Sequence, residues 1–338
     1  MSGIKNARVR AISVYLPEKI LDNAELVRQF GTWTEEKIYG KTGVLRRHVV
    51  NEELVSDLAV GAGEKLFSEH EINPGEIDFL LLCTECPDYF LPATACVVQH
   101  RLGLRKNIGA LDYNLGCSGY IYGMALAKGL ISGGVARKVL LIASDTITRT
   151  IHPMDKSTRA IFGDAATATL VEASDHNGIG NFSLGTDGGG AGKLIIPAGA
   201  WAQPSSPETS KEIVNRWGNV RTSENLYMDG PGVLDFTLEI APPCLDEILK
   251  KNEVELSDIK LVVLHQASRM LLEKIRGALE IPEEKFVINM ENYGNTVGST
   301  IPIALRDMEL SGRLKKDDLV LIMGFGVGLS WGGTVLKW

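Results

Sequence analysis

The chain repeats its own pattern, and this duplication constrains its fold more than any other feature. The apolar stretch 77–83 (IDFLLLC) returns as 259–265 (IKLVVLH), and the stretch 139–144 returns as 320–325. Both repeats lie about 180 residues apart, a spacing that suits two consecutive units of ordinary domain size. We therefore predict two halves of the same topology, residues 1–175 and residues 176–338.

Each half alternates apolar runs with helical stretches. The runs are bounded by turn residues and indicate buried strands at 77–82, 139–143, 166–171, 259–264, 319–323 and 332–337. Helices are predicted at 92–101, 119–132, 231–250, 268–280 and 298–311. Strands that alternate with helices imply mostly parallel sheets covered by helices, so the predicted fold class is α/β.

The composition excludes several classes of protein. Hydrophobic residues make up 44% of the 338 residues, with 36 glycines, which is not typical of disordered or fibrous chains. A net charge of −7 without a concentrated basic run argues against nucleic-acid binding. No apolar stretch approaches the roughly 18 residues of a membrane span, and residues 1–10 lack the apolar core of a signal peptide. We expect a cytoplasmic protein that binds neither nucleic acid nor membranes.

The five cysteines are an odd number at irregular spacing, which favours reduced thiols over a disulfide framework. The pair Cys83 and Cys86 has the spacing of half a zinc site. Neither a second cysteine pair nor paired histidines accompany it, so we expect buried structural thiols and no metal.

Cys117 stands out among them because it lies in a turn flanked by Gly116 and Gly119, directly before the predicted helix 119–132. The unpaired amides and the dipole of a helix N-terminus favour an anion, so the pKa of this thiol is expected to fall. The alternative is a small buried residue at a crowded turn.

Two polar residues of the second half occupy comparable positions. His265 directly follows the predicted strand 259–264, and Asn295 lies in a Gly-punctuated turn (NYGNTVGST) that enters a helix. Open α/β sheets place their active sites at the carboxyl ends of strands. Taken singly, the histidine is equally well explained as structural, and the asparagine as a turn residue or helix N-cap. Under the repeat, Cys83 corresponds to His265, and Gly116-Cys117 corresponds to Gly294-Asn295.

The combination of these motifs on duplicated halves resembles the β-ketoacyl-ACP synthase III family of the thiolase superfamily. The resemblance runs nearly from end to end of the chain. The matching motifs are KTGV (41–44) with RRH (46–48), PDYFLP (87–92), NLGCSGY (114–120), IFGDAA (161–166), HQA (265–267), YGNT (293–296) and GFGVGLSWG (324–332).

The resemblance implies the thiolase fold, in which two similar halves pack into a five-layered αβαβα sandwich. It implies an acyltransferase that performs a decarboxylative Claisen condensation. Cys117 would take an acyl group from a CoA thioester, and His265 and Asn295 would bind the thioester carbonyl of malonyl-ACP while CO2 leaves. The backbone N–H groups of Cys117 and Val327 would form a second oxyanion hole. The product would be 3-oxoacyl-ACP, which initiates the synthesis of fatty acids or related metabolites.

The family needs no bound cofactor, because CoA and phosphopantetheine thioesters are its substrates. The implied partners are acyl carrier protein, acyl-CoA and a second copy of the chain in a homodimer. By position, the resemblance matches Lys41 and Lys156 with arginines that bind phosphate in the family, and Trp33 lies one helical turn before a tryptophan that stacks on adenine. Ser268 stands where the family usually has asparagine and could make a local hydrogen bond, and Arg269, directly after it, is expected to contact the pantetheine or the carrier-protein phosphate. We expect these five residues to bind substrate, against the alternative of ordinary surface charge.

Three other functions stay open at this stage. One is an acyltransferase of specialised metabolism with the same chemistry. The second is condensation without decarboxylation, in the manner of HMG-CoA synthase, with Glu85 as general acid. The third is a non-catalytic subunit that only shapes a partner's pocket, although such subunits normally lack one of the three catalytic residues. The starter acyl group is not visible in the sequence.

Overall fold

The computed structural model describes residues 6–338. The first five residues of the stretch 1–10, which the sequence predicts to be no signal peptide, lie outside this range. Within residues 6–338, no helix is both long enough and apolar enough to cross a membrane.

The first half is built on a five-stranded sheet with the order β1-β7-β6-β4-β5. Strand β4 (Phe79–Cys83) runs parallel to both of its neighbours, β5 (Gly109–Tyr113) and β6 (Lys138–Asp145). Strand β7 (Ala165–Ser174) is antiparallel both to β6 and to β1 (Asn6–Tyr15). Buried apolar side chains on both faces of β4 and β6 explain why these strands read as continuous hydrophobic runs.

The second half repeats this arrangement. Its sheet has the order β13-β14-β15-β8, with β13 (Leu261–Leu264) parallel to β14 (Leu319–Gly326). Strand β15 (Ser330–Lys337) is antiparallel to β14 and to β8 (Ser183–Thr186). On the free side of β13, Phe286 forms a parallel bridge with Val262, at the place that β5 takes beside β4. The duplication read from the sequence is therefore a duplication of strand order and direction.

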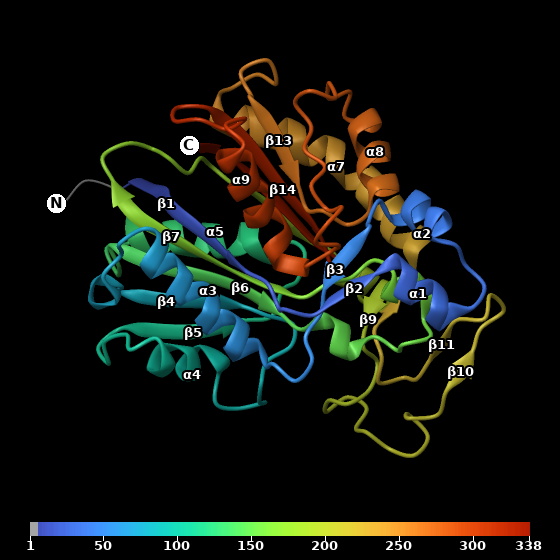
Figure 1. Cartoon of the computed structure of the whole chain (residues 1–338). Helices are drawn as coiled ribbons and strands as arrows, with labels where there is room; N and C mark the ends of the chain where they lie inside the picture. The colour runs from blue at the N-terminus through green and yellow to red at the C-terminus, as the bar shows by residue number, and fades with distance from the viewer. Residues whose placement is uncertain (1–5) are drawn as a thin grey trace.

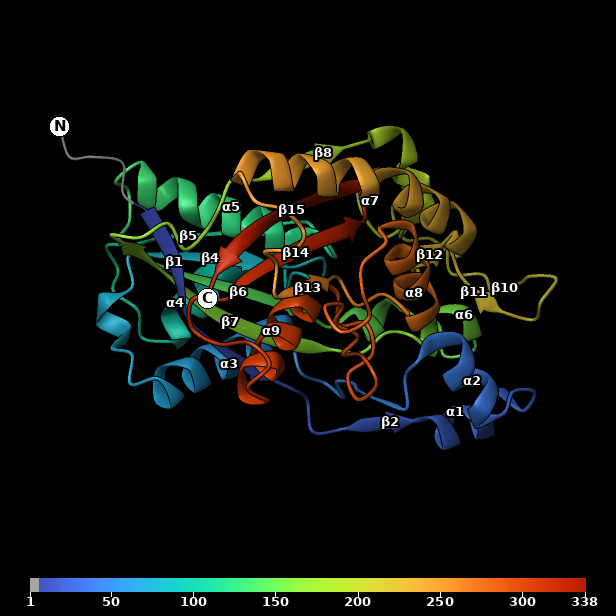
Figure 2. The same cartoon turned by 90° about the horizontal axis from the view of Figure 1, so that it is seen from above.

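The two sheets and their helices form five layers (Figures 1 and 2). Helices α3 (Val55–Glu69) and α4 (Thr94–Arg101) cover the outer face of the first sheet, and their core contains Leu58, Leu80 and Val98. Helices α5 (Gly119–Ser132) and α9 (Thr300–Leu310) lie between the sheets. Helices α7 (Gly230–Asn252) and α8 (Arg269–Ala278) cover the second sheet. The predicted thiolase-type αβαβα fold is confirmed.

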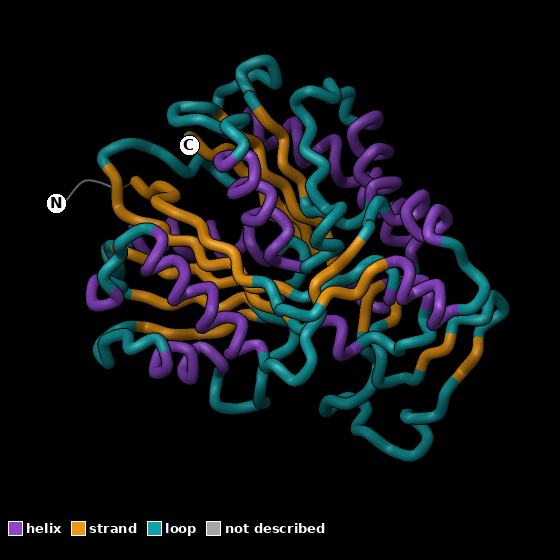
Figure 3. The backbone as a smooth tube through the Cα atoms, in the orientation of Figure 1, coloured by secondary structure: helices purple, strands orange, loops and turns teal. Residues whose placement is uncertain are grey.

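Shorter elements gather at one end of the layers (Figure 3). They are β2 (Ile20–Asp22), α1 (Asn23–Phe30), α2 (Glu35–Thr42), β3 (Arg46–His48), α6 (Lys156–Arg159), β9 (Leu194–Ile195), β10 (Ile213–Val214), β11 (Val220–Arg221) and β12 (Tyr227–Met228). The predicted division after residue 175 falls in the loop between β7 and β8, and it stays a prediction.

Candidate active site

Cys117 lies in the turn between β5 and α5 and is 7% exposed. Ser118 forms the N-cap of α5, and its hydroxyl lies 2.6 Å from the hydroxyl of Ser330 at the start of β15. Gly326, the last residue of β14, packs directly against Cys117. A Cβ on Gly326 would lie 2.5 Å from Cβ and 3.1 Å from Sγ of Cys117. The turn of the first half that carries Cys117 is thus held against the central strands of the second half.

The pKa of the Cys117 thiol is raised well above its ordinary value, first by burial and then by the nearby carboxyl groups of Glu85 and Asp145. This overturns the expectation of a lowered pKa. Cys117 lies before α5 as predicted, but burial and the charges of two acidic side chains raise the pKa of the thiol more than the helix N-terminus lowers it. Deprotonation of Cys117 therefore needs a group that accepts the proton.

His265 follows β13 and continues its ladder, because its backbone N–H donates to Met323 O on β14 (2.9 Å). The imidazole is 5% exposed, and its Nδ1 lies 2.8 Å from the Thr300 hydroxyl oxygen. Burial lowers the pKa of His265 to about 3. The imidazole is consequently neutral at physiological pH and carries one hydrogen.

Asn295 is held by three hydrogen bonds that leave one part of its side chain free. Its backbone N–H donates to Ile161 O (2.9 Å), and its carbonyl accepts from Gly163 N (3.0 Å). The side-chain Oδ1 accepts from Val297 N (2.9 Å). Because the side-chain oxygen is bound to Val297, the nitrogen Nδ2 is the other end of the amide, and its two hydrogens are free to donate among the residues that the structure describes.

Val297 connects the two polar residues and was not found by sequence reasoning. Its N–H donates to Asn295, and its side chain packs in the same apolar cluster as Cys117. Its carbonyl oxygen lies 3.1 Å from the Thr300 hydroxyl oxygen, which is also 2.8 Å from Nδ1 of His265. Its φ of 54° is in the left-handed region, which is strained for a β-branched residue. The strain turns both backbone polar groups of one residue towards His265 and Asn295.

The two backbone N–H groups of the predicted oxyanion hole lie on facing turns. Cys117 precedes α5, and Val327 begins the turn between β14 and β15, directly after Gly326. Within residues 6–338, neither N–H donates a hydrogen bond to an acceptor of another residue. The carbonyl of Val327 is held by the Ser330 hydroxyl (2.6 Å), which fixes the turn.

Apolar side chains surround Cys117 on its remaining sides. The cluster consists of buried Ile147, Ile151, Phe162, Leu194, Leu226 and Val297, with Cys86, Ile161, Met228 and Val327 packed against it. These residues come from both halves of the chain. Such a lining suits a hydrocarbon chain and excludes water from the thiol.

Two further motifs act beneath the site. Arg47 is fully buried, and its guanidinium donates to Leu21 O (3.2 Å), Ala160 O (2.9 Å) and Asn23 Oδ1 (3.0 and 3.1 Å). Asp164 accepts from the backbone N–H groups of Val50 and Thr148, both at 2.9 Å. These residues tie the loops under Asn295 together, so the RRH and IFGDAA motifs are structural supports.

The five predicted substrate-binding residues occupy two places. Lys156 is 8% exposed with Nζ 3.4 Å from Thr32 Oγ1, which is next to Trp33. Trp33 packs edge-on against Phe30 (5.9 Å), and Lys41 lies 5.9 Å from its ring centre. The guanidinium of Arg269 stacks over Tyr39 (5.1 Å). Ser268 is the N-cap of α8, and its Oγ accepts a hydrogen bond from the backbone N–H of Leu271 (3.3 Å).

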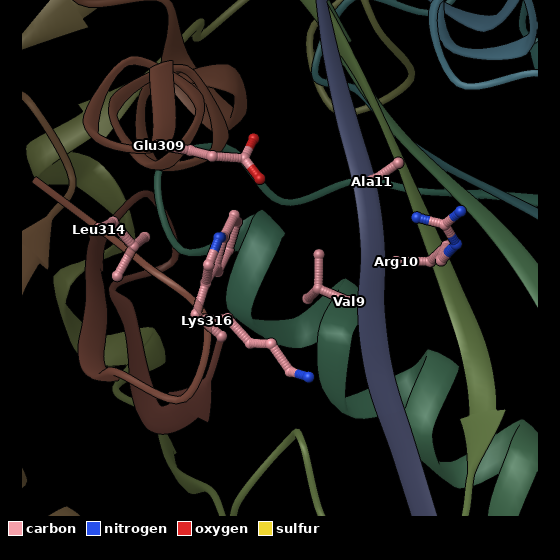
Figure 4. A pocket seen from close by; sticks show the side chains of 7 residues that line it. Val9, Arg10, Ala11, Glu309, Leu314 and Lys316 are labelled. Carbon is pink, nitrogen blue, oxygen red and sulfur yellow. The ribbon is translucent and has the colours of Figure 1, made fainter. Parts of the chain in front are cut away.

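A surface pocket of about 240 Å³ lies elsewhere (Figure 4). It is lined by Val9, Arg10, Ala11, Glu309, Leu314, Lys316 and Trp338. Glu309 is at the opposite end of α9 from Thr300, so this pocket is not the site described above. Residues 6–338 contain no group of three or more His, Cys, Asp or Glu side chains that would hold a metal. Cys83 instead donates its S–H to Leu115 O (2.7 Å).

A thiolase-type fold with a buried cysteine at a helix N-terminus, a neutral histidine after a strand and an asparagine in a turn defines a condensing acyltransferase. Residues 111–188 match the family model of 3-oxoacyl-[acyl-carrier-protein (ACP)] synthase III, and residues 249–338 match the model of its C-terminal part. The chain belongs to the β-ketoacyl-[acyl-carrier-protein] synthase III family.

Individual relatives agree over the full length. The β-ketoacyl-[acyl-carrier-protein] synthase III of Clostridium tetani is 35% identical over 337 residues, covering 99% of this chain and 100% of the relative. A crystal structure of a 3-oxoacyl-(acyl-carrier-protein) synthase III is 44% identical with a TM-score of 0.97, covering 98% of this chain and all of the other. The priming β-ketosynthase of the R1128 polyketide pathway is 26% identical with a TM-score of 0.86, covering 99% and 97%.

Proposed function

We propose that this enzyme transfers an acyl group from acyl-CoA to Cys117 and condenses it with malonyl-ACP to give 3-oxoacyl-ACP and CO2, the first condensation of fatty-acid synthesis. The observation that carries the proposal is the pair of connections made by Val297. These connections orient the free Nδ2 donor of Asn295 and one ring nitrogen of His265, next to the apolar cluster that contains Val297 and Cys117.

In the first half of the reaction, the Cys117 sulfur attacks the thioester carbonyl. The oxyanion that forms accepts hydrogen bonds from the N–H groups of Cys117 and Val327, and the apolar cluster receives the acyl chain. In the second half, malonyl-ACP replaces CoA. Asn295 Nδ2 and His265 Nε2 donate to its thioester carbonyl, where negative charge accumulates as CO2 leaves, and the resulting carbanion attacks the acyl-enzyme.

The same proposal assigns the entrance of the substrates. Lys41, Lys156 and Trp33 bind the nucleotide end of CoA, while Arg269 and Ser268 lie along the pantetheine arm. The loss of arginine's two-pronged geometry at positions 41 and 156 weakens phosphate binding relative to an arginine. The working form is a cytoplasmic homodimer that meets acyl carrier protein at this entrance, and no resident cofactor takes part.

Intact mass measurement tests the covalent step. The protein is incubated with a panel of acyl-CoA and acyl-ACP donors beside Cys117→Ala, and malonyl-ACP is then added. We expect one class of donor to add its acyl mass to the wild type only, and malonyl-ACP to remove that mass with release of 3-oxoacyl-ACP. If no donor labels Cys117, the role of a non-catalytic partner subunit becomes the better explanation.

A further inference from the structure

Glu85 is a half-buried acidic residue beside Cys117 that the steps above do not use. It follows β4, and its carboxyl group lies against the Gly116 backbone. A Cβ on Gly116 would lie 2.4 Å from Oε1 and 2.6 Å from Oε2 of Glu85, so the carboxyl group occupies the space directly beside the residue that precedes Cys117. Within residues 6–338, no protein group donates a hydrogen bond to this carboxyl.

Asp145 at the end of β6 completes a pair with Glu85. Its Oδ1 accepts from the Glu85 backbone N–H (2.7 Å) and from the Thr84 hydroxyl (3.3 Å), while its Oδ2 has no partner in the described part of the chain. Burial raises the pKa of Glu85 to about 7, and burial together with Glu85 raises the pKa of Asp145 well above its usual range. Two carboxyl groups whose charges interact in this way share a proton near neutral pH.

The other ionisable groups around Glu85 are thiols. Burial raises the pKa of each of them well above its ordinary value, and each also feels the charge of Glu85; they are Cys83, Cys86 and Cys117. These thiols are uncharged at neutral pH. Asp145 is therefore the neighbour that shares charge and proton with Glu85.

His265 is unsuited to accept the Cys117 proton if it fulfils its assigned role. As a donor to malonyl-ACP it must carry its hydrogen on Nε2, and its Nδ1 is occupied by Thr300. A neutral imidazole with Nε2–H has no free lone pair facing the thiol. The unpartnered carboxyl beside Gly116 is then the group left to handle this proton.

We propose that Glu85 is a further catalytic residue, which accepts the Cys117 proton during acylation and returns it to the departing donor thiol. This inference rests on the proposed function of Cys117. The S–H bond of Cys117 breaks as an O–H bond forms on Glu85, and the sulfur bonds to the acyl carbon. The bond from that carbon to the donor sulfur then breaks, and the donor thiolate takes the proton from Glu85. The products are acyl-Cys117 and a free donor thiol.

Glu85→Gln separates this role from a purely electrostatic one. Loss of a nearby negative charge lowers the pKa of Cys117, so its alkylation by iodoacetamide at fixed pH should become faster, measured by peptide mass with Cys117→Ala as blank. Acylation by acyl-CoA in a single turnover should become at least about tenfold slower, because the proton carrier is gone. If both reactions become faster, Glu85 acts only through its charge and the proposal is overturned.

Asp145→Asn provides a second test should the first variant fold poorly. Asparagine cannot hold the shared proton, so Glu85 then titrates alone and the acidic limb of the pH profile for acylation should change its position or steepness. An unchanged limb contradicts the proposal. Failure of the proposed function looks different, because the wild type would then take no acyl group from any donor while iodoacetamide still alkylated Cys117.

Discussion

Nδ1 of His265 lies 2.8 Å from the hydroxyl oxygen of Thr300, the first residue of α9. The same hydroxyl lies 3.1 Å from the carbonyl oxygen of Val297. A hydroxyl has one hydrogen, so its direction decides which ring nitrogen of the neutral imidazole is protonated. When Thr300 donates to Nδ1, Nε2 carries the hydrogen and can bind an oxyanion.

Thr300→Val should impair decarboxylation selectively. Valine keeps the branched shape but leaves Nδ1 with no donor, so the ring hydrogen moves to Nδ1 and Nε2 becomes an acceptor. Loss of one oxyanion donor predicts a decrease of about 10²–10³-fold in CO2 release from malonyl-ACP. Acylation of Cys117 should stay within a few-fold of wild type. Thr300→Ser should restore the rate, and the ¹⁵N shifts of His265 should report the change of tautomer. Equal slowing of both half-reactions would indicate structural damage instead.

Asn295→Asp tests the second donor. The aspartate keeps an oxygen for the Val297 N–H, but it places a second oxygen where Nδ2 donated. A repelled oxyanion predicts at least about a 10²-fold loss of decarboxylation with little change in the melting temperature. Both are measured on the purified variant with malonyl-ACP. Retained decarboxylation would remove Asn295 from the proposed machinery.

Gly326→Ala should disturb the nucleophile, because the new methyl group would lie 2.5 Å from Cys117 Cβ. Backbone on both sides is held in β14 and in the turn that carries Cys117, so the contact has little room to relax. We expect acylation to fall at least about tenfold, in line with the cost of small misplacements at a reacting centre. Gly277→Ala on α8 is the matched control, since its Cβ would meet nothing within 4 Å. Equal activity of the two variants would contradict the close packing.

Much of the architecture could be predicted because its signals are local. The helix predicted at 119–132 matches α5, and the buried strands read as apolar runs. Other boundaries shifted for physical reasons. The predicted helix 298–311 begins with a 3-10 turn, Val297–Ser299, before α9, and α7 continues to Asn252 despite Pro242 and Pro243 within it.

The electrostatics of the site could not be predicted in the same way. The raised pKa of Cys117 comes from burial and from Glu85 and Asp145, which precede and follow it in separate segments. The conformation of Val297 carries no sequence signal either, since valine disfavours a positive φ. Long-range packing imposes both features. The motifs therefore predict which residues react but not the groups that set their protonation.

His265 should make the folded state sensitive to acid. Burial lowers its pKa from 6.5 to about 3, so between these values the unfolded chain binds a proton that the folded chain does not. Stability from this group is complete above pH 6.5 and is lost as pH falls, by about 1.4 kcal/mol per pH unit. His265→Gln should remove this slope. Urea unfolding of both proteins between pH 7 and 5 gives the difference, and parallel curves would contradict the lowered pKa.

Arg47 should contribute to stability far more than its neighbour Arg46. Arg47→Leu leaves the carbonyls of Leu21 and Ala160 and the Asn23 side chain without their buried donors. An unmatched buried polar group costs about 1–3 kcal/mol, so we expect the free energy of unfolding to fall by at least about 3 kcal/mol. Arg46→Leu removes one surface contact, to Asn292, and should lower the free energy of unfolding by no more than about 1 kcal/mol. A hydrophobic replacement stabilises a buried ionic site only when its partners are replaced as well. Here the acceptors are mainly backbone carbonyls, which no substitution removes. Urea unfolding of both variants measures the loss of unfolding free energy. A similar loss for Arg47→Leu and Arg46→Leu would mean that water replaces the guanidinium of Arg47.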